Sequence, residues 1–91
     1  MKKIRLTVYG RVQGVGFRYM TKFVADQYGI KGLVKNQADG SVYIEASGSP
    51  ERIALFIQKI KASPTPSGRV DDYELEYDDT LPTYSSFKVT Y

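Results

Sequence analysis

The order of the predicted secondary-structure elements indicates an α+β sandwich. Segments with alternating apolar residues, typical of half-buried strands, are separated by two segments with helical spacing. The resulting order is β-α-β-β-α-β, followed by one further strand. Two helices in this order pack on one face of an antiparallel sheet, which is the ferredoxin-like sandwich. With 91 residues the chain is long enough for one core, and we expect a single domain over residues 1–91.

The first third of the chain predicts a strand and a helix. In residues 3–9 the apolar Ile4, Leu6 and Val8 alternate with more polar residues, so one face of this strand should be buried. Residues 17–28 have apolar side chains every three or four positions, which is typical of an amphipathic helix.

The middle of the chain predicts a hairpin and a second helix. Residues 30–36 and 41–47 are extended runs, and the Asp-Gly pair at residues 39–40 is a strong hairpin signal. Residues 49–51, Ser-Pro-Glu, open a helix with a capping residue, a first-turn proline and a first-turn acid. Its apolar face consists of Ile53, Phe56, Ile57 and Ile60.

The last third predicts a loop and two strands. Residues 62–68 contain two prolines, a glycine and several small hydroxyl residues, so they form a loop. Residues 70–77 and 86–91 alternate again. The acidic residues between 71 and 79 are expected to form a solvated sheet edge, which fits better than a metal site.

Composition limits the chemistry of the chain. It has no cysteine and no histidine, which excludes disulfides, thiolate nucleophiles, zinc–thiolate sites and imidazole bases. A net charge of +3 favours anionic ligands but lacks the basic stripe of a nucleic-acid binder. No apolar run suits a signal peptide or a membrane span. We therefore expect a cytoplasmic protein with no nucleic-acid or membrane partner, and a monomer is the default expectation.

Residues 8–18, Val-Tyr-Gly-Arg-Val-Gln-Gly-Val-Gly-Phe-Arg, carry the most chemical information. Three glycines let the backbone curl tightly and bring its N–H groups close to a ligand. A helix starting near Phe17 directs its unpaired N–H groups to the same point, where negative charge is stabilised. Arg18 adds a planar, permanently charged fork suited to phosphate or carboxylate. We interpret this segment as an anion cradle, although the glycines alone are also typical of a tight strand-to-helix connection.

Topology brings a second polar residue towards the cradle. A right-handed crossover places the first two strands parallel, so their C-terminal ends lie at the same edge of the sheet. The cradle leaves the first strand there, and Asn36 ends the second. The alternative for Asn36 is a turn-capping role before the hairpin. Lys35, its neighbour, is a weaker candidate for steering anions to the mouth of the site.

Tyr73, Tyr77 and Tyr91 have strand spacings that predict packing within the sheet.

Two spaced segments resemble signatures of the acylphosphatase family. Residues 8–18 match its pattern of an aliphatic residue, x, Gly, x, Val-Gln-Gly-Val, x, Phe, Arg at every defined position. Residues 32–48 resemble the second signature, including Asn36 and its glycines. Leu33 departs from it, because the family usually has an aromatic residue there. We interpret this as a difference in packing.

The resemblance implies an enzyme that hydrolyses acyl phosphates to a carboxylate and inorganic phosphate, with no cofactor and no metal. Arg18 and the loop amides would bind the phosphoryl group, and Asn36 would hold the attacking water through its side-chain amide. The implied loop positions are Val12, Gln13, Gly14, Val15, Gly16 and Phe17. A loose phosphoryl-transfer transition state mainly needs positioning and charge stabilisation, which amides and arginine supply. The expected ligands are a small acyl phosphate and, in the cradle, inorganic phosphate or other anions.

Two other functions stay open. The RNA-recognition fold has the same order of elements, but it displays aromatic residues on its central strands within a basic surface. Here those strands offer only Tyr9 and Tyr43, so this alternative is weak. The second alternative is an acylphosphatase-like domain that binds anions without turnover, as occurs inside larger maturation enzymes. The presence of both Arg18 and Asn36 favours the enzyme.

Overall fold

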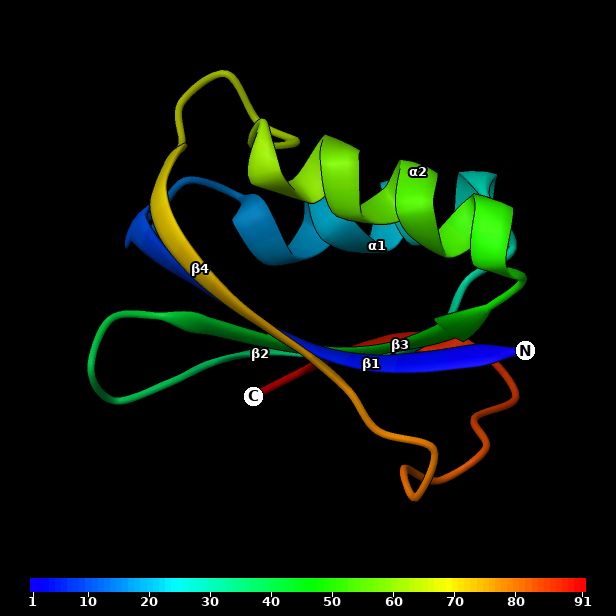
Figure 1. Cartoon of the computed structure of the whole chain (residues 1–91). Coiled ribbons are helices and arrows are strands. Elements are labelled where there is room, and N and C mark those ends of the chain that lie inside the picture. Colours follow the sequence, from blue (N-terminus) through cyan, green and yellow to red (C-terminus); the bar gives the residue numbers. More distant parts are fainter.

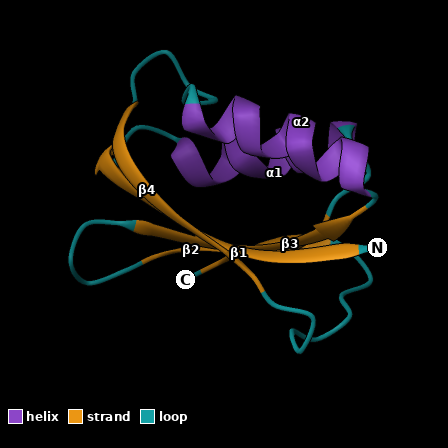
Figure 2. Ribbon diagram, in the orientation of Figure 1, coloured by secondary structure: helices purple, strands orange, loops and turns teal.

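The protein folds into two layers, one of helices and one of strands. The computed structural model describes residues 1–91. Its elements are β1 (Lys2–Arg11), α1 (Phe17–Gln27), β2 (Lys31–Asn36), β3 (Val42–Gly48), α2 (Pro50–Lys61), β4 (Arg69–Tyr77) and β5 (Phe87–Thr90). Both helices cover the same face of one five-stranded sheet (Figures 1 and 2). The predicted order of elements and the ferredoxin-like sandwich are confirmed.

The strand order β4-β1-β3-β2-β5 places β3 at the centre. β3 pairs antiparallel with both β1 and β2, so β1 and β2 run parallel to each other, as a right-handed crossover requires. β5 pairs in parallel with β2, from Gly32↔Phe87 to Lys35↔Thr90, and this makes the sheet mixed and not wholly antiparallel.

The parallel pair follows from where β4 ends. Ile4 at the start of β1 is paired with Tyr77 at the end of β4, so the chain leaves β4 at the end of the sheet where β1 and β2 begin. β4 and β5 are at opposite edges, and residues 78–86 connect them across the helix-free side of the sheet (Figure 1). The connection reaches β2 at its start, so β5 runs in the same direction as β2.

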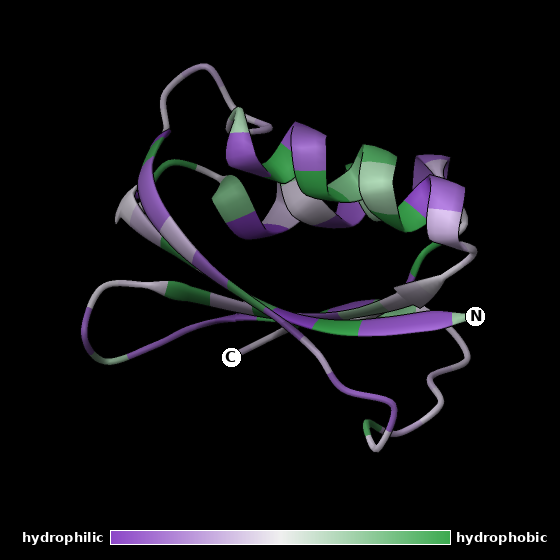
Figure 3. Ribbon diagram, viewed as in Figure 1, coloured by the Kyte–Doolittle hydropathy of each residue, from purple (hydrophilic) through white to green (hydrophobic).

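The core lies between the helices and the sheet. Ile4, Leu6 and Val8 of β1 are each 0% exposed, as their alternation predicts. Apolar and polar residues also alternate along α2 (Figure 3), whose four predicted apolar residues are all buried. The Phe56 and Phe87 rings meet with centroids 6.1 Å apart, which joins α2 to β5. No helix is both long and apolar enough to cross a lipid bilayer.

The prediction that three tyrosines pack within the sheet is wrong. Tyr73, Tyr77 and Tyr91 are 40%, 59% and 87% exposed. The first two lie on β4, an edge strand, and the third follows β5 at the other edge, so neighbouring strands enclose none of them. Each ring instead has a cation 4.4–4.9 Å from its centroid: Lys61 over Tyr73, Lys2 over Tyr77 and Arg18 over Tyr91.

Candidate active site

The glycine-rich connection between β1 and α1 uses the left-handed backbone region that glycine adopts readily. Gly14 has φ 74° and Gly16 has φ 79°. A Cβ atom built on either would have no heavy atom within 4 Å, so both glycines border open space. The backbone conformation, and not crowding by neighbours, is therefore what requires glycine at these positions.

The backbone N–H groups of residues 12–19 make no hydrogen bond within the protein. The first bond of α1 runs from the Met20 N–H to the Gly16 carbonyl, at 3.1 Å. α1 also lacks a side-chain cap and has no acidic residue in its first turn. α2 differs, because Ser49 caps it by accepting a hydrogen bond from the Arg52 N–H, and Glu51 lies in its first turn. A row of free donors at an uncapped helix N-terminus favours an anion.

Arg18 is held beside these donors by the end of the chain. Its Nη1 donates to the Thr90 carbonyl at 3.2 Å, and its guanidinium carbon lies 4.7 Å from the centroid of the Tyr91 ring. The hydroxyls of Tyr19 and Tyr91 are hydrogen-bonded to each other. The ion pairs of the protein involve Arg5, Lys22 and Arg69, so no carboxylate neutralises Arg18.

Asn36 ends β2 and has an unpartnered buried atom. Its Oδ1 is inaccessible to solvent and has no hydrogen-bond partner in the protein. Because strand side chains alternate, Asn36 shares the helix-covered face with buried Val34, whereas Lys35 is on the other face. Lys35 Nζ lies 5.7 Å from the centroid of the Tyr43 ring on that face. The expectation that Lys35 flanks the mouth of the site is therefore wrong.

One cavity of about 100 Å³ collects these groups. Its lining residues are Val12, Gly14, Gly16, Phe17, Arg18, Tyr19 and Asn36. This volume is well above the roughly 10–15 Å³ that one water molecule needs, so the cavity has room for a small tetrahedral anion. The structure thus brings Arg18 and Asn36 together with four of the six expected loop residues.

The other two expected loop residues, Gln13 and Val15, direct their side chains elsewhere. Gln13 Nε2 donates to the carbonyls of Gln37 (2.8 Å) and Ser41 (2.9 Å), which ties the cradle to the β2–β3 hairpin. Val15 packs against the core. These two residues can therefore contribute to an anion site only through their backbone N–H groups.

The hairpin to which Gln13 binds is itself held by local hydrogen bonds. Asp39 Oδ1 accepts from the Ser41 N–H (2.9 Å) and from the Ser41 hydroxyl (2.5 Å). These bonds keep the pKa of Asp39 below its usual value. A rigid turn directly after Asn36 limits how far that side chain can move relative to the cradle.

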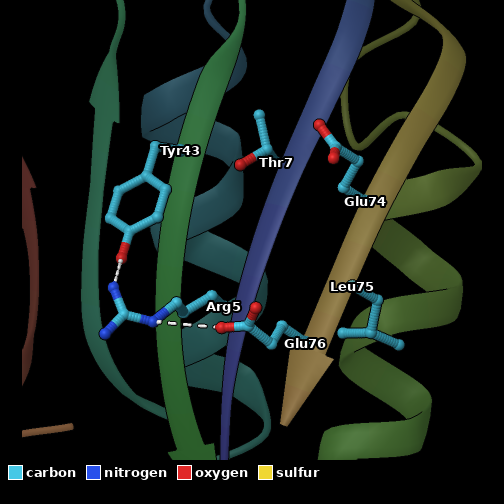
Figure 4. Close-up of a pocket in the computed structure, with 6 residues that line it drawn as sticks. All are labelled: Arg5, Thr7, Tyr43, Glu74, Leu75 and Glu76. Atoms are coloured by element: carbon cyan, nitrogen blue, oxygen red, sulfur yellow. Dashed lines mark hydrogen bonds and ion pairs between the residues drawn. The ribbon is translucent and has the colours of Figure 1, made fainter. Parts of the chain in front are cut away.

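A second hollow, of about 230 Å³, lies on the helix-free face of the sheet (Figure 4). Its central cation, Arg5, already has partners in the protein, donating to Asp78 (3.0 Å) and to the Tyr43 hydroxyl (2.9 Å). Hydrogen bonds from Thr80 and Arg5 lower the pKa of Asp78 to about 2. This network fastens residues 78–86 to the sheet, so we assign the hollow a structural role.

Sequence reasoning missed the groups that hold Arg18 in place. Tyr19 is detectable as the neighbour of Arg18 in the first turn of α1, and it lines the cavity. Thr90 and Tyr91 give no local signal, because they are more than 70 residues away along the chain. No group of three or more carboxylate side chains is placed to hold a metal ion.

Fold and cavity together define a ferredoxin-like protein with a small cavity at the N-terminus of α1. The model of the acylphosphatase family matches residues 4–89, and the chain belongs to that family of hydrolases. An acylphosphatase of Enterococcus faecalis is 53% identical over 89 residues, which cover 98% of each chain. The crystal structure of acylphosphatase from Bacillus subtilis matches with a TM-score of 0.95 and 36% identity over the whole of both chains.

The same fold also occurs as a small part of a longer protein. The crystal structure of full-length HypF in the phosphate- and nucleotide-bound form matches with a TM-score of 0.85 and 30% identity. The match covers 98% of this chain but only 12% of HypF. Family membership leaves the RNA-recognition alternative without support.

Proposed function

We propose that the cavity at the N-terminus of α1 is the active site of this acylphosphatase, where the carboxyl–phosphate bond of a small acyl phosphate is hydrolysed. The observation that carries the proposal is the meeting of three unsatisfied features in one cavity. These are the free N–H groups of residues 12–19, the cation of Arg18 without a carboxylate partner, and the buried Oδ1 of Asn36. We further propose that residues 1–91 act as one domain, monomeric and cytoplasmic.

The phosphoryl group binds to the cradle amides and to Arg18. Each hydrogen bond between a charged group and its partner is worth about 1.5–3 kcal/mol. Because Nη1 of Arg18 is held by Thr90 and the guanidinium is stacked on Tyr91, the remaining N–H groups are already oriented before substrate arrives. Donors that need no reorganisation contribute most to stabilising the charge of the transition state.

Asn36 positions the attacking water. A buried amide oxygen without a donor costs about 1–3 kcal/mol, and a water molecule that donates to Oδ1 removes this cost. The water oxygen forms a bond to phosphorus while the bond from phosphorus to the acyl oxygen breaks. The electron pair of that bond leaves with the carboxylate, and a proton of the water passes to a phosphoryl oxygen.

This mechanism needs no side chain that acts as a general base. The cavity is lined by no carboxylate and no lysine, and the chain has no histidine. A carboxylate is a good leaving group, and a loose phosphoryl-transfer transition state requires little proton transfer before the bond breaks. Catalysis then rests on positioning and on stabilisation of the phosphoryl oxygens.

The test is release of inorganic phosphate from benzoyl phosphate, measured with and without EDTA, with p-nitrophenyl phosphate as the control substrate. We expect fast hydrolysis of benzoyl phosphate and none of the ester. Loss of activity in EDTA would contradict the metal-independent mechanism. Binding of inorganic phosphate without hydrolysis would instead support a non-catalytic anion-binding domain, an alternative motivated by the 30% identity to a small part of HypF.

A further inference from the structure

The loop between α2 and β4, residues 62–68, touches the cradle from a distant part of the sequence. Thr65 in this loop is 7% exposed, and its hydroxyl donates to the Val15 carbonyl at 3.1 Å. Thr65 and Val15 are 50 residues apart along the chain. Thr65 does not line the cavity, so any effect on a ligand must act through the cradle backbone.

The loop holds the Thr65 hydroxyl in one place. Ser63, in the left-handed region at φ 66°, donates its hydroxyl to the Thr65 carbonyl at 2.8 Å. The Gly68 N–H donates to the same carbonyl at 3.2 Å, and the Ser67 N–H donates to Thr65 Oγ1 at 3.4 Å. A Cβ atom on Gly68 would lie 3.0 Å from Thr65 Cγ2, which shows how closely the loop is packed.

The peptide unit between Val15 and Gly16 makes this hydrogen bond relevant to the anion. A trans peptide is planar, and its C=O and N–H point in opposite directions. When Thr65 holds the Val15 carbonyl, the Gly16 N–H is directed away from residues 62–68. That N–H has no acceptor in the protein, and Gly16 lines the cavity.

No other hydrogen bond holds the C=O or the N–H of this peptide unit. Gly16 borders open space, where a Cβ atom would meet no atom within 4 Å, and glycine populates positive and negative φ with similar ease. Rotation of the Val15–Gly16 peptide would turn a carbonyl oxygen towards the bound anion in place of an N–H donor. The Thr65 hydroxyl stabilises the orientation that presents the donor.

We propose that Thr65 is a positioning residue for phosphoryl binding, acting through the Val15 carbonyl to direct the Gly16 N–H into the cradle. This inference rests on the proposed function, since it concerns the same site. It assigns to the α2–β4 loop a role in anion affinity, although no residue of this loop lines the cavity.

The test compares Thr65→Val, which keeps the shape and removes the hydroxyl, with Thr65→Ser, which keeps the hydroxyl. Ser49→Ala is the matched control, because it removes a helix-capping hydroxyl at the start of α2, away from the cradle. The dissociation constant for inorganic phosphate is measured by calorimetry, and kcat and KM are measured with benzoyl phosphate. We expect Thr65→Val to weaken phosphate binding about tenfold or more, since tenfold is the lower end of what one hydrogen bond to a charged group is worth. Thr65→Ser and Ser49→Ala should stay within twofold of wild type.

Phosphate affinity within twofold of wild type in a folded Thr65→Val protein would overturn the inference. So would equal impairment of Thr65→Ser, which would attribute the effect to the lost methyl group. If Thr65→Val does not fold, the wild-type protein is titrated with phosphate and its amide NMR signals are monitored, which tests whether the Gly16 N–H binds the anion. The Gly16 N–H must be among the most shifted amides, and an unshifted Gly16 would refute its place in the cradle. Phosphate binding requires no turnover, so these results stand apart from failure of the hydrolysis assay.

Discussion

Replacing Arg18 with alanine tests the phosphate site most directly. With Nη1 donating to Thr90, the guanidinium still has a fork of N–H groups free for two hydrogen bonds to a phosphoryl group. At about 1.5–3 kcal/mol each, their loss amounts to about 3–6 kcal/mol. At 1.4 kcal/mol per tenfold, this weakens binding by a factor of roughly 10²–10⁴. Calorimetric titration with inorganic phosphate measures the change, and kcat/KM for benzoyl phosphate should fall at least as far.

Two further variants distinguish the contribution of the planar guanidinium of Arg18 from that of its positive charge. Lys31→Ala removes an exposed cation at the start of β2, at the opposite end of that strand from Asn36, so it lowers the net charge equally and should change phosphate affinity less than threefold. Arg18→Lys keeps the charge without the planar fork, and we expect an intermediate loss. Arg18→Ala also loses the stacking on Tyr91, worth about 0.5–1 kcal/mol at an exposed site, and thermal melts will detect this. Phosphate affinity within threefold of wild type in Arg18→Ala would refute the assignment of the cradle.

Three other changes test separate parts of the reasoning. Asn36→Ala should reduce kcat by at least a hundredfold and leave the phosphate dissociation constant within about threefold, because Asn36 acts on water; substantial residual turnover would remove it from the mechanism. Gly16→Ala, at φ 79°, should lower the free energy of unfolding by about 1–2 kcal/mol and weaken phosphate binding. Gly29→Ala, at φ 66° beyond the other end of α1, should be destabilising to a similar degree with phosphate affinity unchanged, and equal losses of affinity in both would contradict the role of the loop. The pKa of Asp78 is lowered to about 2, so its contribution to stability is present above the unfolded pKa near 4 and is lost as the pH falls towards 2. In Asp78→Asn, the free energy of unfolding measured with urea should decrease less as the pH falls. An unchanged dependence of this free energy on pH would show that the network around Arg5 does not stabilise the fold.

The local features of the fold could be predicted from the sequence, because they depend on neighbours along the chain. Alternation in β1 predicts which residues are buried, and the Ser-Pro-Glu run at residues 49–51 predicts the start of α2. The glycines and Arg18 likewise predict an anion cradle at the β1–α1 connection, since positive φ and a helix N-terminus are local properties. Predicting the position of Asn36 required one further step, the right-handed crossover that brings two parallel strand ends together.

What the sequence by itself determined is thus the set of elements, their order and the glycine-rich connection that leads into α1. Only the tertiary structure decided the parallel pairing of β5, the stacking of Tyr91 on Arg18, and the hydrogen bond from Thr65 to Val15. These features join residues far apart along the chain. Their formation depends on strand direction and register, which the packing of the whole core sets and which no local preference of the residues involved encodes.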